Sequence, residues 1–143
     1  MERIIVFVIA TMLAFGSITS SAADVNTQES KSTVKENVEV YYFHFTRRCV
    51  TCNAVETETK NALGALYPDQ VKSGAVKFIE VNLDDKNSKS AAKKAKAQGQ
   101  ALIILKGDKR VDLTTQGFMY AVSNPERLKN EIKKAVDSML TSN

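Results

Sequence analysis

The sequence predicts an α/β domain with a mixed central sheet and helices on both faces. Runs rich in β-branched and aromatic residues alternate with helix-like stretches, in the order strand, helix, strand, helix, hairpin, helix. Two strands joined through a helix imply a parallel pair, because a crossover connection lays the second strand beside the first in the same direction. A short Gly107-Asp108 link between the last two strands adds an antiparallel partner. No internal repeat interrupts this order.

Residues 1–23 have the pattern of a secretory signal peptide. Arg3 precedes an apolar segment from Ile4 to Phe15, and small residues follow at Ser20 to Ala23. The apolar segment is shorter than the roughly 20 residues that cross a bilayer, so we expect cleavage rather than a stable membrane anchor. The mature chain is then expected to start at Ala23 or Asp24. Export predicts a periplasmic or extracellular location, where a disulfide can persist.

Residues 24–37 are polar and lack an apolar period, which predicts a flexible linker. The remaining residues, 38–143, are long enough to form one domain with its own core. The net charge is +4, from 20 Lys and Arg against 16 Asp and Glu. The lysines are spread over helix-like stretches without interleaved aromatic residues, so nucleic acid is not an expected partner.

The first strand is expected from Val38 to Phe45. Its residues are apolar on both alternations, which is typical of a central strand that is covered on both faces. A helix from Asn53 to Leu66 follows, with an apolar stripe that includes Val55, and Pro68 ends it.

The second half of the chain continues the same alternation. A strand is expected over Ala75 to Leu83, and a helix over Lys86 to Gln98 with Gly99 as its C-cap. The hairpin follows, with Ala101 to Leu105 as a buried strand and Arg110 to Thr114 as its partner.

The last helix is predicted to begin at the capping sequence Ser123-Asn124-Pro125-Glu126. One face is apolar, with Leu128, Ile132, Ala135, Val136 and Met139. Phe118, Met119 and Tyr120 precede this helix and are expected to form a packed loop, with a partner-binding apolar surface as the alternative.

The most informative motif is Cys49-Val50-Thr51-Cys52, which lies between the first strand and the first helix. If Cys49 is the N-cap, the backbone N–H groups and the positive end of the helix dipole favour its thiolate. Arg47 and Arg48 are expected to act in the same direction, and a lowered thiol pKa makes a nucleophile. An inert structural disulfide is disfavoured, because closing so short a loop removes little entropy from the unfolded chain.

With this motif after a strand, the chain resembles the thioredoxin fold in its minimal form, over roughly residues 38–140. Val81-Asn82-Leu83-Asp84 at the end of the second strand and the Gly99-to-Leu105 entry into the hairpin also carry the resemblance. The stretch from Phe43 to Cys52 is most similar to small exported thioredoxin-like proteins known as ArsF-type nitroreductase subunits. The resemblance implies a redox-active disulfide in which Cys49 attacks and Cys52 resolves.

Two departures from the thioredoxin pattern concern acidic residues. Thioredoxins carry a buried acid six residues before the first cysteine, and here that position is Phe43. On the following strand, where a lysine is usual, this chain has Glu80. If Glu80 lies beneath Cys52, it could accept the proton that Cys52 loses before resolving a mixed disulfide. The alternative is a solvent-facing glutamate.

Two further departures concern the substrate groove and the redox potential. The loop before the hairpin has Gly99-Gln100-Ala101 where thioredoxins have a cis-proline, and we expect its peptide bonds to be trans. Val50 and Thr51 replace the Gly-Pro pair between the cysteines. With Arg47 and Arg48 nearby and no buried acid, the potential is expected to be more oxidising than that of thioredoxin.

These residues predict an exported thiol-disulfide oxidoreductase with no cofactor besides its disulfide, acting on protein thiols or disulfides. The alternative is an accessory module that binds copper or passes electrons to a reductase partner. Cys49 and Cys52 suffice for linear Cu(I), and His44 is a candidate third ligand. A histidine satisfied by a backbone group in or near the core is the other interpretation of His44.

Overall fold

The structure, a computed structural model, describes residues 36–142. The expected signal peptide lies outside these residues. So does the expected linker, except for Glu36 and Asn37, which are both exposed. Within residues 36–142, no helix combines the length and the apolar character needed to cross a membrane.

Four strands form one mixed sheet in the order β2-β1-β3-β4. Strand β1 (Val38–His44) runs parallel to β2 (Val76–Asn82) and antiparallel to β3 (Ala101–Lys106), and β3 pairs antiparallel with β4 (Lys109–Asp112). The predicted parallel pair, the hairpin and the central place of the first strand are confirmed.

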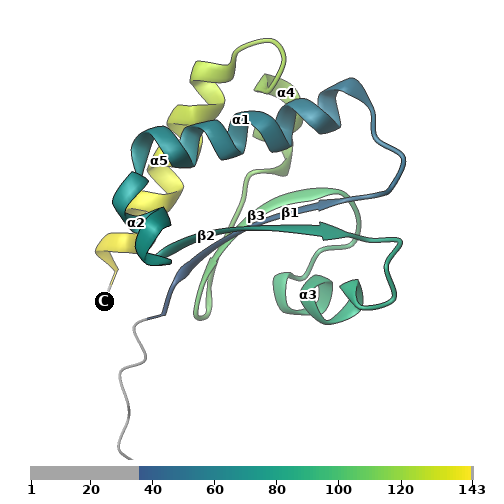
Figure 1. The fold of residues 1–143 in the computed structure, drawn as a ribbon, viewed down its shortest axis with the longest axis horizontal. Helices are drawn as coiled ribbons and strands as arrows, with labels where there is room; N and C mark the ends of the chain where they lie inside the picture. Colours follow the sequence, from purple (N-terminus) through teal and green to yellow (C-terminus); the bar gives the residue numbers. More distant parts are fainter. Residues whose placement is uncertain (1–35, 143) are drawn as a thin grey trace, which may run out of the picture. The chain divides into compact units, whose positions relative to one another are not determined.

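Helices cover both faces of this sheet (Figure 1). Of the five helices in residues 36–142, α3 (Ser88–Ala95) lies on one side of the sheet and the others lie on the opposite side. The element order and the two-sided covering agree with the α/β class expected from the sequence and with a minimal thioredoxin-like fold. The helices are α1 (Val50–Leu66), α2 (Pro68–Ser73), α3 (Ser88–Ala95), which lies alone on its side, α4 (Thr114–Tyr120) and α5 (Pro125–Thr141).

Successive side chains of β1 point to opposite faces of the sheet and pack into two separate hydrophobic clusters. Val40 and Tyr42 pack into the cluster formed with α1 and α5, whereas Tyr41 and Phe43 pack into the cluster beneath α3. All four side chains are buried. Burial on both faces is the reason that β1 is apolar at successive positions instead of at every second one.

Helix α5 follows its prediction closely. Asn124 is the N-cap, with its side chain accepting a hydrogen bond from the Arg127 backbone N–H at 3.1 Å. Pro125 occupies the first turn, where its missing N–H leaves no helical hydrogen bond unmade. All five predicted apolar residues of this helix are buried.

Two short helices were not predicted. Pro68 does end α1, but it also begins α2, since proline is favoured in the first turn of a helix. The stretch with Phe118, Met119 and Tyr120 belongs to α4 instead of a loop. Gly117 of α4 is buried, and an added Cβ would lie 3.3 Å from Val55, so the absence of a side chain lets α4 approach α1 closely.

The predicted end of α3 was also wrong. The helix stops at Ala95, where Lys96 takes the left-handed conformation with φ 53°, and Gly99 is not its cap. The Arg110 side chain of β4 donates a hydrogen bond from Nε to the Ala95 carbonyl at 2.9 Å. This contact from a distant part of the chain satisfies a carbonyl that the helix end leaves open.

Candidate functional site

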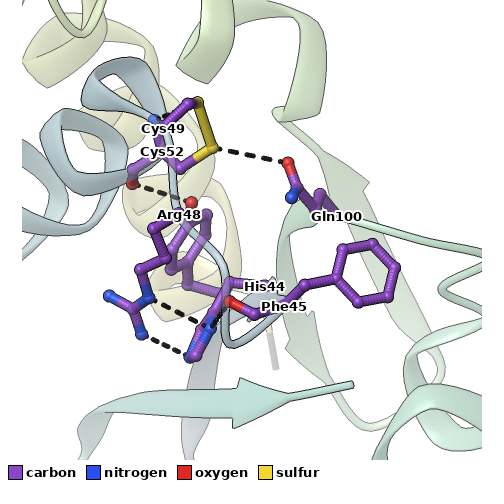
Figure 2. The surroundings of a disulfide bond; sticks show 7 residues. His44, Phe45, Arg48, Cys49, Cys52 and Gln100 are labelled. Carbon is purple, nitrogen blue, oxygen red and sulfur yellow. Dashed lines mark hydrogen bonds between the residues drawn. A yellow bond between two sulfur atoms is a disulfide. The ribbon is translucent and has the colours of Figure 1, made fainter. Parts of the chain in front are cut away.

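Cys49 and Cys52 form a disulfide at the junction of β1 and α1 (Figure 2). Cys49 is the N-cap of α1, with extended backbone angles of φ −89° and ψ 168°. Its Sγ accepts a hydrogen bond from the Cys52 backbone N–H at 3.2 Å. The predicted N-cap is therefore confirmed, and one orphan N–H at the helix start already points at this sulfur.

The two cysteines differ sharply in their exposure. Cys49 is exposed, whereas Cys52 lies one turn into the helix and is only 2% exposed. An incoming thiol or disulfide can reach the Cys49 sulfur from solvent, and Cys52 is shielded. This asymmetry agrees with the predicted division between an attacking and a resolving cysteine.

Tyr42 of β1 forms a hydrogen bond with the first turn of α1. Its side chain is fully buried, and its hydroxyl donates a hydrogen bond to the Cys52 carbonyl oxygen at 2.8 Å. Burial is the main cause that raises the pKa of Tyr42 to about 12, so the hydroxyl stays a neutral donor at physiological pH. From the sequence, Tyr42 was expected only as an apolar residue of the first strand. Its hydroxyl could have indicated a hydrogen bond, because a buried tyrosine hydroxyl usually has a hydrogen-bond partner.

The loop that precedes Cys49 is tied to the end of β2. The Thr46 backbone N–H donates to Asp84 Oδ2 at 2.8 Å, and Asn82 Nδ2 donates to Thr46 Oγ1 at 2.9 Å. The bond from the Thr46 backbone lowers the pKa of Asp84 below its usual value, which keeps its carboxylate charged. The Asn82-to-Asp84 segment, quoted above for the thioredoxin resemblance, thus holds the loop of the site in place.

Arg48 turns away from the disulfide. Its guanidinium forms ion pairs with Glu56 of α1 and Glu80 of β2. Figure 2 shows it beside the imidazole of His44, which lies 2.5 Å from Nη2 through its Nε2. Two carboxylates therefore balance the charge that was expected to support the Cys49 thiolate. Arg47 is exposed, and its predicted contribution stays a prediction.

Glu80 belongs to this ion-pair arrangement. Its Oε1 lies 3.0 Å from His44 Nε2, and its Oε2 lies 3.6 Å from Lys60 Nζ. Its side chain is 39% exposed, and neither cysteine sulfur is among its hydrogen-bond or ion-pair partners. The alternative of a solvent-facing glutamate describes it better, and the role of proton acceptor for Cys52 has no contact to support it.

His44 is buried at the end of β1, with its Nδ1 2.9 Å from the Phe45 carbonyl oxygen. Its ring nitrogens face Arg48, Glu80 and this carbonyl, as expected for a histidine satisfied near the core. Within residues 36–142, no three His, Cys, Asp or Glu side chains come together as a metal-holding group. The structure therefore does not join His44 to the two sulfurs as a third ligand.

We refer to Arg48, Glu56, Lys60 and Glu80 as the ionic cluster. Glu56 is its least exposed carboxylate, at 13%. Burial alone would raise the pKa of Glu56, but hydrogen bonds from Lys60 and Arg48 outweigh it and lower the pKa below its usual range. A carboxyl group whose pKa is lowered by folding stabilises the protein above its ordinary pKa, and this stabilisation is lost as the pH falls through the folded value.

Replacing Glu56 by Gln should therefore destabilise the protein at pH 7 by about 1.5 kcal/mol, since hydrogen bonds to a charged group are lost. At an acid pH below the folded pKa of Glu56, where the wild-type carboxyl is protonated, the difference should shrink markedly. Denaturant unfolding at the two pH values measures both quantities. Glu58→Gln on the same helix is the matched control. An equal destabilisation by Glu56→Gln at both pH values would contradict this account.

Gln100 brings a polar group to the buried sulfur. It lies in the loop before β3, where Oε1 of its amide is 3.6 Å from Cys52 Sγ (Figure 2). All peptide bonds among the described residues are trans, so the expectation for Gly99-Gln100-Ala101 is confirmed. The same three residues line an open hollow of about 490 Å³ that continues along Arg110 and Thr114. A side-chain amide thus occupies the neighbourhood where the resemblance implies a proline ring.

Comparisons with known proteins leave the family of this chain undetermined. No protein-family model matches the sequence, and no curated protein matches it. The chain is similar to a solved structure described as "Structure of a malarial protein", with 21% identity and a TM-score of 0.45 over 73% of this chain and 99% of that one. The geometry and chemistry of the site are therefore the basis for inferring a function.

Proposed function

We propose that the protein is an exported thiol-disulfide oxidoreductase of the thioredoxin-like superfamily. One observation carries the proposal: Cys49, an exposed residue that caps the start of α1, is disulfide-bonded to the buried Cys52. Such a pair can exchange with an external disulfide at one sulfur while the other is kept from solvent. Export rests on the signal-peptide pattern of residues 1–23.

In the reducing direction, the Cys49 thiolate attacks one sulfur of a substrate disulfide. A mixed disulfide forms on Cys49, and the other substrate sulfur leaves as a thiolate that takes up a proton. Cys52 then loses its proton to solvent, and its thiolate attacks Cys49 Sγ. The Cys49–Cys52 bond forms, and the second substrate thiolate leaves. Two electrons pass from the protein to the substrate, and the reverse sequence oxidises a dithiol.

The surface around Cys49 favours a macromolecular partner. Phe45 is 40% exposed and Val50 is 80% exposed, and both lie close to Cys49 along the chain. Large apolar side chains left in solvent beside a reactive sulfur suit contact with another protein. The same surface supports the electron-passing alternative, in which a larger reductase, as in the ArsF-type resemblance, takes the place of a protein substrate.

Trapping tests the proposal directly. Cys52→Ala should accumulate a mixed disulfide between Cys49 and a partner protein in the exported fraction, because the thiol that would resolve this intermediate is missing. Cys49→Ala should accumulate far less, since its remaining cysteine is buried. Non-reducing gels, followed by mass spectrometry of the reduced complex, identify the adduct and the cysteine that carries it.

A copper module predicts a different pattern for the same two variants. Each substitution would abolish metal retention about equally, because linear Cu(I) needs both thiolates, and neither would accumulate a covalent partner. Wild-type protein that co-purifies with stoichiometric copper, together with an absence of adduct in Cys52→Ala, would overturn the oxidoreductase proposal.

A further inference from the structure

The side-chain amide of Gln100 lies beside the sulfur of the resolving cysteine. Cys52 is 2% exposed, so water can do little to solvate its sulfur. The Cys52 backbone N–H is already directed at Cys49 Sγ. Among the described residues, the amide of Gln100 is the side-chain polar group within hydrogen-bonding distance of Cys52 Sγ, at 3.6 Å.

We propose that Gln100 stabilises the Cys52 thiolate during the resolving step by donating an amide N–H to it. The inference rests on the proposed function, and it adds a catalytic residue that the motif does not contain. Glu80, the acidic residue first considered for this step, contacts Arg48, His44 and Lys60 instead. A glutamine cannot remove the proton from Cys52, so its contribution is to favour the charged sulfur and not to act as a base.

The amide suits a sulfur that changes its protonation state. A thiol could donate its proton to Oε1, but Cys52 Sγ is part of a disulfide in the structure, so the 3.6 Å from Oε1 shows how near the amide lies and is not a hydrogen bond. A thiolate and a disulfide sulfur carry no proton, so they can only accept, and a half-turn of the amide presents Nε2–H to them. The open hollow beside Gln100 gives its side chain room for this turn.

Loss of the hydrogen bond from Gln100 should measurably slow the resolving step. A buried thiolate without a hydrogen-bond donor is disfavoured by desolvation. One hydrogen bond to a charged group is worth enough to change the population of the thiolate by about tenfold or more. The rate of resolution depends on that population, whereas the attack by Cys49 does not involve Gln100.

A coloured aromatic disulfide reagent separates the two steps. One equivalent added to the reduced protein releases a first coloured thiolate when Cys49 attacks, and a second when Cys52 resolves the mixed disulfide. Gln100→Leu should slow the second release about tenfold or more and leave the first unchanged. Gln100→Glu should also slow the second release, because a carboxylate has no donor and its charge opposes a neighbouring thiolate.

Gln98→Leu, a neighbour in the same loop, is the matched control and should change neither phase. Folding of each variant is checked by thermal unfolding, and Gln100→Glu carries the test if Gln100→Leu does not fold. A second phase at the wild-type rate in both variants would overturn the inference. So would a slow phase in Gln100→Leu alone, since that would indicate packing instead of hydrogen-bond donation.

Because the reagent replaces the protein partner, failure of the trapping experiment would reject the proposed function without deciding the role of Gln100.

Discussion

Iodoacetamide is expected to alkylate Cys49 of the reduced protein about 100-fold faster than Cys52 at neutral pH. Two effects act together. The helix start and the Cys52 N–H are expected to favour the thiolate of Cys49, while burial disfavours the thiolate of Cys52 and blocks access to it. Timed alkylation followed by peptide mass mapping gives both rates in one experiment, and repeating it across pH gives the two titrations separately.

The same reaction in denaturant is the internal control. In the unfolded chain neither the helix start nor the burial exists, so the two cysteines should react at similar rates. Faster labelling of Cys52 in the folded protein, or equal rates there, would contradict the assigned roles of attacking and resolving cysteine.

The ionic cluster changes the electrostatic explanation of this reactivity. The sequence suggested that Arg48 supports the Cys49 thiolate, but its guanidinium is held by Glu56 and Glu80. With Lys60 included, the cluster carries two positive and two negative side chains. We therefore expect the Cys49 thiolate to be stabilised mainly by the backbone at the start of α1, where the Cys52 N–H is directed at the sulfur.

Much of the fold was accessible from the sequence because its signals are local. Each of these signals depends on a few neighbouring residues: the apolar residues at successive positions of β1, the capping residues of α5 and the short turn at Gly107. The short helices α2 and α4 were missed because they bury too few residues to leave a periodic pattern. The end of α3 was misplaced because Lys96 adopts a left-handed conformation that usually belongs to glycine.

The site shows a similar division between local and distant signals. The motif predicted the N-cap role of Cys49, since that role follows from where the helix begins. The partner of Arg48 on β2 and the partner of Cys52 before β3 lie 32 and 48 residues away along the chain. Contacts at such separations depend on the packing of the sheet, which a single sequence does not specify residue by residue.

The equilibrium potential of the Cys49–Cys52 pair tests the central claim, that this disulfide is built for exchange. Metal-free protein is equilibrated with a series of glutathione buffers, and the reduced fraction is read from alkylated mass. Stabilisation of the Cys49 thiolate at the helix start favours the reduced form, so we predict a potential above the roughly −270 mV of thioredoxin. For this two-electron couple, every 30 mV or so is a tenfold change in the equilibrium. A potential below about −300 mV, typical of structural disulfides, would contradict the account.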